Sequence, residues 1–210
     1  MSNTENPDDF IEPKKLEAIF SNFFRLLLSE GRSAATMEAV ANAVMIDPDL
    51  LRRRFKDETD LVAPAMRWYI FRFSQQVESS SAMYADIYSC MHTMLTDFTE
   101  LCYRQTETEG NLYWSAIGDL GLIDPVLGNE YRSLRFEWMA DIRRRLVKYE
   151  NDLQDPQDIE HLSNYFMMVF EGIIQMVKFD TPIGDVFSAI DITMEALTSR
   201  MKKLPPHLLD

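Results

Sequence analysis

Three consecutive arginines, at residues 52–54, are the residues whose type and spacing could do the most specific chemistry in this chain. Guanidinium groups bind phosphate oxygens and guanine edges through paired hydrogen bonds. Residues 36–61 read as a short helix, a tight turn, a second short helix and the start of a third. Units of this kind lay their second helix in the major groove of DNA. The alternative is a solvated helix face whose arginines pair with Asp57, Glu58 and Asp60.

Two acidic side chains mark the start of the second short helix. Asp47 followed by Pro48 predicts a helix start, because aspartate accepts hydrogen bonds from the first amides and proline fits the first helical position. Asp47 and Asp49 would face DNA. A carboxylate can accept a hydrogen bond from cytosine N4, but it repels the phosphate backbone that supplies most of the affinity.

The composition predicts a protein with a sizeable core that is built from helices. Of the 210 residues, 46% are hydrophobic, and only 7 are Gly and 9 are Pro. The formal net charge of −13 gives a field that repels nucleic acid. Residues 13–61 nevertheless carry as many basic as acidic residues, so the excess of acid lies in the rest of the chain.

Neither cysteines nor histidines form a recognisable site. A helix spanning Cys90 to Cys102 is about 18 Å long, whereas a disulfide needs Cα atoms within about 7 Å, so we expect no bridge. His92, His161 and His207 have no metal-ligand spacing. No phosphate-binding glycine loop or nucleophile motif is present. We therefore expect no catalytic site, no metal and no cofactor.

The N-terminal residues are polar and acidic, without the charged and apolar regions of a signal peptide. No apolar run approaches the roughly 20 residues of a membrane-spanning helix. These features predict a soluble cytoplasmic protein.

The apolar spacing predicts an all-α chain of about nine helices. We expect an acidic disordered tail over residues 1–10, a helix-turn-helix domain over 11–61 and a larger helical domain over 62–205. Gly31 should end the first helix, Thr36 should cap the second, and residues 78–82 and 106–110 should be loops. The first expected helix ends at Gly31, and the third begins at Pro48. The short helix at residues 112–117 should be broken by Gly118 and Gly121. The other expected helices span residues 36–44, 57–77, 85–104, 125–149, 156–179 and 183–202.

The order of helices and the N-terminal pattern resemble the TetR family of bacterial one-component regulators. The resemblance rests on six residues at these spacings: Thr36, Ala41, Ile46, Leu51, Phe55 and Leu61. It implies a homodimer formed by residues 156–179 and 183–202, a ligand pocket in the C-terminal domain, and a palindromic DNA operator. The implied function is that of a repressor released from DNA by a small apolar or amphipathic ligand.

The chain departs from the family pattern where DNA is read. Met45 replaces the glycine of the turn, and Arg52 replaces a phosphate-contacting tyrosine. Pro48 and Asp49 stand where the family has lysine and glycine, and Glu58 replaces a lysine. The DNA-contact roles are carried over to Thr36, Asp47, Asp49, Arg52, Arg53, Arg54 and Lys56.

Aromatic and methionine residues of the larger domain are the candidates for a ligand site, since methionine side chains adapt to varied apolar ligands. The candidates are Met91, Met94, Phe98, Tyr113, Trp114, Trp138 and Phe170. The alternative is plain core packing. A second arginine triplet, residues 143–145, is expected to form surface or interhelical ion pairs.

Two other functions compete with a DNA-binding regulator. Asp47, Asp49, Glu58 and the net charge favour a TetR-shaped interaction protein that no longer reads DNA directly. A helical enzyme would need a site whose residues are not apparent from sequence spacing.

Overall fold

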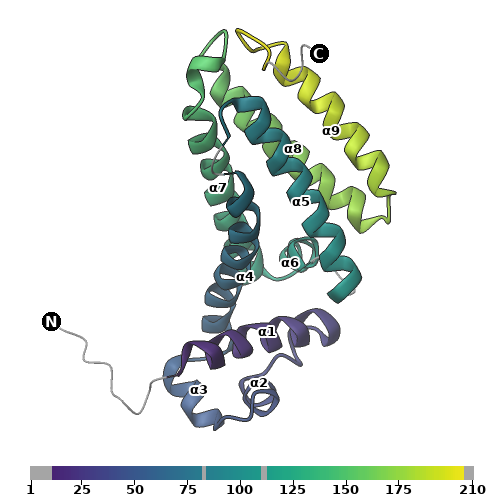
Figure 1. The fold of residues 1–210 in the computed structure, drawn as a ribbon. Helices are drawn as coiled ribbons and strands as arrows, with labels where there is room; N and C mark the ends of the chain where they lie inside the picture. Colours follow the sequence, from purple (N-terminus) through teal and green to yellow (C-terminus); the bar gives the residue numbers. More distant parts are fainter. Residues whose placement is uncertain (1–10, 82–83, 110–112, 206–210) are drawn as a thin grey trace, which may run out of the picture. The chain divides into compact units, whose positions relative to one another are not determined.

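The computed structural model describes residues 11–81, 84–109 and 113–205, so the predicted tail over residues 1–10 lies outside the described residues. Within the described part the chain forms nine α-helices and one short 3-10 helix, and the predicted all-α fold is confirmed (Figure 1). The helices are α1 (Pro13–Glu30), α2 (Met37–Ala43), α3 (Pro48–Arg54), α4 (Glu58–Ser81), α5 (Ile87–Glu109), α6 (Tyr113–Gly121), α7 (Pro125–Val147), η2 (Glu150–Asp152), α8 (Asp158–Lys178) and α9 (Ile183–Thr198).

The chain divides into two compact units. The first comprises residues 1–73 and 117–131, and the second comprises residues 74–116 and 132–210. The first unit therefore contains more than the predicted helix-turn-helix domain, because the corner between α6 and α7 belongs to it.

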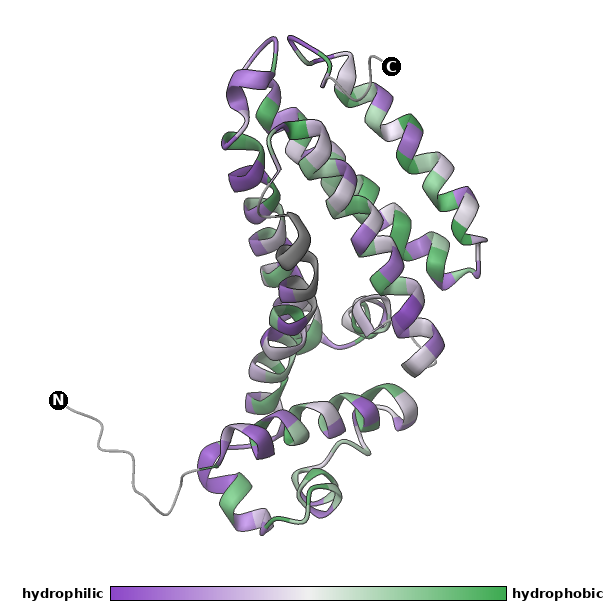
Figure 2. Cartoon of the chain, viewed as in Figure 1, coloured by the Kyte–Doolittle hydropathy of each residue, from purple (hydrophilic) through white to green (hydrophobic). Residues whose placement is uncertain are grey.

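The core of the first unit is built around α1. Apolar and polar residues alternate along this helix with the helical period (Figure 2), and its apolar side is buried. The ring of Phe20 lies 6.2 Å from that of Phe55 and 6.0 Å from that of Trp68, and Phe24 lies 5.8 Å from Tyr69. These aromatic contacts fix α1 against the end of α3 and the first half of α4.

In the second unit, α5 packs against both α8 and α9, and α8 packs against α9. Each of these helices buries one side: Leu95 and Phe98 of α5 and Phe166 and Phe170 of α8 are at most 3% exposed. The residues of α8 and α9 that point away from this core remain on the surface.

Several predicted boundaries are wrong. Helix α4 continues through Ser81, so the predicted interruption at residues 78–81 is not there, and Ala82 lies outside the described residues. Helix α5 continues to Glu109, and within it the hydroxyls of Thr106 and Thr108 donate to the carbonyls of Cys102 and Arg104 one turn earlier. Gly110 and Leu112 lie outside the described residues.

The glycines of α6 and the ends of the last helices also differ from expectation. Helix α6 passes through Gly118 and ends at Gly121. A Cβ at Gly121 would stand 3.0 Å from the Cα of Gly128, so a side chain does not fit there. Helix α7 ends at Val147. Helix α8 begins at Asp158 rather than at Pro156, and α9 ends at Thr198 rather than at residue 202.

The turn between α2 and α3 contains a residue in a left-handed conformation. Met45 has φ 54°, and its side chain is 91% exposed. A left-handed conformation is unfavourable for a residue with a Cβ, and buried contacts of the methionine do not offset this cost.

Replacing Met45 with glycine should raise the free energy of unfolding by about 1 kcal/mol, because the left-handed conformation carries no Cβ penalty in glycine. Urea unfolding monitored by circular dichroism measures the change. Asp180→Gly is the matched control: Asp180 also has φ 54°, but aspartate tolerates this conformation better, so its gain should be smaller. A destabilised Met45→Gly variant would contradict the expectation.

Candidate nucleic-acid interface

Local capping chemistry builds α2 and α3. The hydroxyl of Thr36 accepts a hydrogen bond from the amide of Ala39 at 3.1 Å, and the carboxylate of Asp47 accepts one from the amide of Asp49 at 2.9 Å. Both predicted caps are confirmed. Between the two helices the amide of Ile46 donates to the carbonyl of Ala41 at 3.0 Å and closes the turn. The two short helices are thus held in a helix-turn-helix arrangement.

The arginine triplet lies at the end of α3, and all three side chains are exposed. Arg52 donates through Nη1 to Asp49 at 2.9 Å, and its Nη2 pairs with Glu38 of α2. The guanidinium of Arg54 lies 5.9 Å from the ring centroid of Phe55. The predicted contact residues Asp47, Asp49 and Lys56 are also exposed, whereas Thr36 is half-buried.

The three acids that were considered as partners of the arginines accept hydrogen bonds from backbone amides. Asp57 accepts from the amides of Thr59 and Asp60, and Asp60 accepts from the amide of Lys56. Glu58 accepts from the amide of Met37 at 2.9 Å and so joins the start of α4 to the start of α2. Sequence spacing gave no sign of this last contact, because the two residues lie in different helices.

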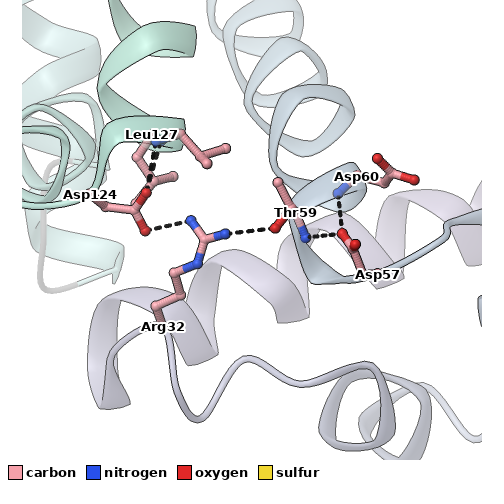
Figure 3. Close-up of polar contacts among 7 residues, drawn as sticks. Arg32, Asp57, Thr59, Asp60, Asp124 and Leu127 are labelled. Atoms are coloured by element: carbon pink, nitrogen blue, oxygen red, sulfur yellow. Dashed lines mark hydrogen bonds and ion pairs between the residues drawn. The ribbon is translucent and has the colours of Figure 1, made fainter.

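A polar cluster that the sequence did not reveal surrounds Arg32 (Figure 3). Its Nη1 donates to Asp124, just before α7, and its Nη2 donates to the hydroxyl of Thr59 in the first turn of α4 at 3.0 Å. Asp124 also caps α7 by accepting from the amides of Val126 and Leu127. One guanidinium therefore connects the starts of two helices within the first unit.

Asp124 has a pKa below its usual range. Burial raises the pKa, but the hydrogen bonds from Leu127, Val126 and Arg32 and the positive charge of Arg32 outweigh this effect. A carboxylate with a lowered folded-state pKa contributes stability above its unfolded pKa of about 3.9, and this contribution is lost as pH falls through the folded pKa.

Asp124→Asn keeps a capping side chain and removes the charge, so it should lower the free energy of unfolding at neutral pH by about 1 kcal/mol. Urea unfolding at neutral pH and below pH 4 tests this. The difference from the wild type should shrink at the lower pH. It should also shrink at neutral pH when both proteins carry Arg32→Met. An equal difference at both pH values would contradict the role of the Asp124 charge.

Four of the predicted ligand residues form one aromatic cluster in the second unit. The ring of Trp138 lies 5.4 Å from those of Phe98 and Trp114 and 5.3 Å from that of Phe170. Phe98 and Phe170 are 4.9 Å apart. The rings are in mutual contact, so in this conformation the cluster is packed core, which was the alternative interpretation.

The remaining predicted ligand residues lie on α5 and α6, the helices that also carry Phe98 and Trp114. Met91 and Met94 are buried on α5, two turns and one turn before Phe98, and Tyr113 is half-buried at the start of α6. Ser115, which the sequence did not single out, is buried on α6 beside Trp114. Among the described residues its hydroxyl has no hydrogen-bond partner.

The outer sides of α8 and α9 carry exposed apolar and small residues. Met168 of α8, Phe179 directly after α8 and Ile192 of α9 are each more than half exposed. A Cβ added to Gly172 or Gly184 would meet no atom within 4 Å. We use the name α8–α9 face for a set of exposed residues: Asn164, Met168, Gly172 and Gln175 of α8, Phe179 after it, and Gly184, Ser188 and Ile192 of α9.

The second arginine triplet is engaged in ion pairs. Arg143 of α7 pairs with Glu160 of α8, and Arg144 and Arg145 both pair with Asp141. The predicted surface and interhelical pairing is observed.

The part of the chain that the structure describes holds no group of three or more His, Cys, Asp and Glu side chains arranged to hold a metal ion. Within the same residues, no helix combines the length and the apolar character that crossing a membrane requires. Cys90 and Cys102 are free and buried, and burial raises the pKa of both thiols. His207 lies outside the described residues.

No model of a protein family matches the chain, and no curated protein matches its sequence. Solved structures do share its fold. A protein from Rhodococcus sp. assigned to the TetR family of transcriptional regulators has a TM-score of 0.73 at 14% sequence identity. The match covers 91% of this chain and 100% of that protein.

Two further solved structures carry a bound molecule. CifR, a TetR family transcriptional regulator solved as a cysteine mutant with 26-bp operator DNA, has a TM-score of 0.59 at 15% identity over 85% of this chain and 98% of its own. A protein from Saccharomonospora viridis, described as a transcriptional regulator and solved in complex with choline, has a TM-score of 0.64 at 15% identity over 91% of this chain and 100% of its own. This chain therefore has the fold of TetR-like transcriptional regulators. All three proteins are described as regulators and none as an enzyme.

Proposed function

We propose that this chain is a dimeric transcriptional regulator that binds a palindromic DNA operator through α3 and releases it when a small ligand binds the second unit. The observation that carries the proposal is the capped α2–turn–α3 arrangement with three exposed arginines at the end of α3. Such a helix can enter the major groove while neighbouring side chains contact phosphates. The structural neighbour CifR was solved with operator DNA.

The side chains at and near the end of α3 have different proposed roles in DNA binding. Arg53, Arg54 and Lys56 supply positive charge for phosphate contacts. Thr36 and Asp47 cap the two helices, which leaves positioning rather than contact as their main role.

The aromatic cluster is the proposed ligand site. Its rings touch one another, so a ligand would have to separate them, and binding would shift the conformational equilibrium only by the ligand's preference for the separated state. A small apolar or amphipathic molecule fits such a site. Choline, which is bound in the Saccharomonospora viridis neighbour, carries a trimethylammonium cation, and aromatic faces attract such cations.

The competing function is that of an interaction protein with this fold that does not bind DNA directly. Asp47, Asp49, Glu58 and the net charge of −13 favour it. Asp47 and Asp49 belong to the α2–α3 surface, which we define as the exposed residues Glu38, Asp47, Asp49, Arg52, Arg53, Arg54 and Lys56. A measurement of binding to duplex DNA distinguishes the two functions, because only the regulator should bind DNA directly.

Repeated selection from a pool of random duplexes, followed by a salt titration of the selected duplex, tests the proposal. A regulator should enrich a palindrome, and its affinity should fall steeply with added salt because phosphate contacts release counterions. Failure to retain any duplex at low salt would exclude direct DNA binding and favour the interaction protein.

A further inference from the structure

The acidic side chains on the α2–α3 surface converge on one arginine. Glu38 of α2 and Asp49 of α3 come from different helices, yet both contact the guanidinium of Arg52. Asp49 accepts from Nη1 at 2.9 Å, and Glu38 pairs with Nη2. A guanidinium has five N–H donors. The two contacts use two of them, so within the described part of the chain three are left for a partner outside the protein.

This cluster contributes little to the stability of the fold. All three side chains are about half exposed or more, and exposed ion pairs contribute only about 0–1 kcal/mol. Its clearer effect is on the freedom of the arginine. A free arginine side chain loses considerable rotamer entropy when it becomes ordered, and a side chain that is already held in place loses less on binding.

The two carboxylates also indicate what Arg52 would contact. They would repel a phosphate group that approached Arg52, because like charges would come close together. A guanine edge carries no net charge and offers two acceptors, O6 and N7, that fit a fixed guanidinium. Orientation matters more than net charge for such a contact.

We propose that Glu38 and Asp49 are positioning residues that hold Arg52 ready to read a guanine edge in the major groove. The acidic surface of the helix-turn-helix then sets sequence specificity instead of preventing DNA binding. This inference rests on the proposed function of DNA binding, and it assigns Arg52 to a base and not to a phosphate. Asp47 has a different role, since its carboxylate caps α3 and accepts from the amide of Asp49.

The test compares Glu38→Gln with Asp49→Asn, singly and combined, against the control Asp57→Asn. The control removes one negative charge from the same unit, and asparagine can still cap the start of α4, where Asp57 accepts from the amides of Thr59 and Asp60. For each protein, fluorescence anisotropy gives the affinity for the selected duplex and for a scrambled duplex of equal length. The specificity ratio is the quotient of these two affinities.

We expect Asp57→Asn to strengthen binding to both duplexes by the same factor and to leave the specificity ratio unchanged. The combined Glu38→Gln and Asp49→Asn variant should strengthen binding to the scrambled duplex but lower the specificity ratio about tenfold. In a background of Arg52→Ala, the same two substitutions should no longer change the ratio, because no arginine remains to be positioned.

An unchanged or higher specificity ratio in the combined variant would overturn the positioning role while leaving DNA binding intact. A wild-type protein that binds neither duplex at low salt would overturn the proposed function and this inference together. Circular dichroism of each variant establishes that the helices are retained.

Discussion

Replacing Arg52 and Arg54 together with alanine should weaken binding to the selected duplex about 100-fold or more. A well-placed arginine contact to a base contributes about 1–3 kcal/mol of discrimination, and each 1.4 kcal/mol corresponds to a tenfold change in affinity. The exposed side chains leave the core untouched, so the folded state should survive. Fluorescence anisotropy over a series of salt concentrations measures both the affinity and its salt dependence.

The salt dependence separates the roles of the two arginines. Removal of a phosphate contact lowers the slope of log affinity against log salt by about 1, whereas removal of a base contact leaves the slope nearly unchanged. The proposed roles therefore predict a slope lower by about 1 for the double variant, with that loss attributable to Arg54.

The second arginine triplet provides a matched control. Arg143 and Arg144 are exposed on α7 in the second unit, where they pair with Glu160 and Asp141. Replacing these two with alanine removes the same charge from the chain without altering the α2–α3 surface. Equal losses of DNA affinity in both double variants would indicate a general charge effect and contradict a contact role for Arg52 and Arg54.

The features that the sequence predicted well depend on neighbours in the chain. Thr36, Asp47 and Gly31 were predicted to cap or end helices, and each does so, because capping joins atoms only a few residues apart. The apolar residues of α1 and α8 likewise recur with the helical period, and the side of each helix that they mark is the buried one. Such local and periodic signals were sufficient for the all-α fold.

The serine run at residues 79–81 shows where local reasoning failed. Serine competes with the backbone for hydrogen bonds and is a weak helix former, so a loop was expected. Helix α4 nevertheless extends to Ser81. A propensity of a few tenths of a kcal/mol per residue does not decide the end of a long helix.

The contacts that define the candidate site join residues far apart in sequence. Arg32 and Asp124 are separated by 92 positions, and no spacing rule pairs them. Glu38 and Arg52 lie on consecutive helices, but their contact depends on how the turn at Met45 directs α3. The sequence therefore predicted which residues are chemically able to act, while their partners came from the tertiary fold.

This distinction changes the interpretation of the acidic residues. From the sequence alone, Asp49 is expected to repel the phosphates of DNA. In the structure it is paired with Arg52, and Asp47 is a helix cap. The residues that favoured the interaction protein thus have local structural partners, which weakens the argument for that alternative.

Replacing Met168 and Ile192 together with glutamate should convert the proposed dimer to a monomer. The two residues are 61% and 67% exposed on the α8–α9 face, where the resemblance to the TetR family places a four-helix interface. In a two-fold symmetric dimer both copies contribute the same residues to the interface, so the variant would place four carboxylates there. Because burying each charge costs several kcal/mol, dimerisation should weaken by more than about 10³-fold.

Sedimentation equilibrium over a range of protein concentrations measures the change, with Phe136→Glu as the control. Phe136 of α7 is 62% exposed and lies outside the α8–α9 face, so its substitution also replaces an exposed apolar side chain with a carboxylate, but it does not reach the proposed interface. A wild-type monomer, or a dimer that survives the double substitution, would contradict the assignment.

Loss of the dimer should also weaken DNA binding. Half-sites on one face of the duplex lie about 34 Å apart, and a single copy cannot contact both. The monomer should therefore bind the palindrome no more tightly than an isolated half-site, even though its α2–α3 surface is unchanged.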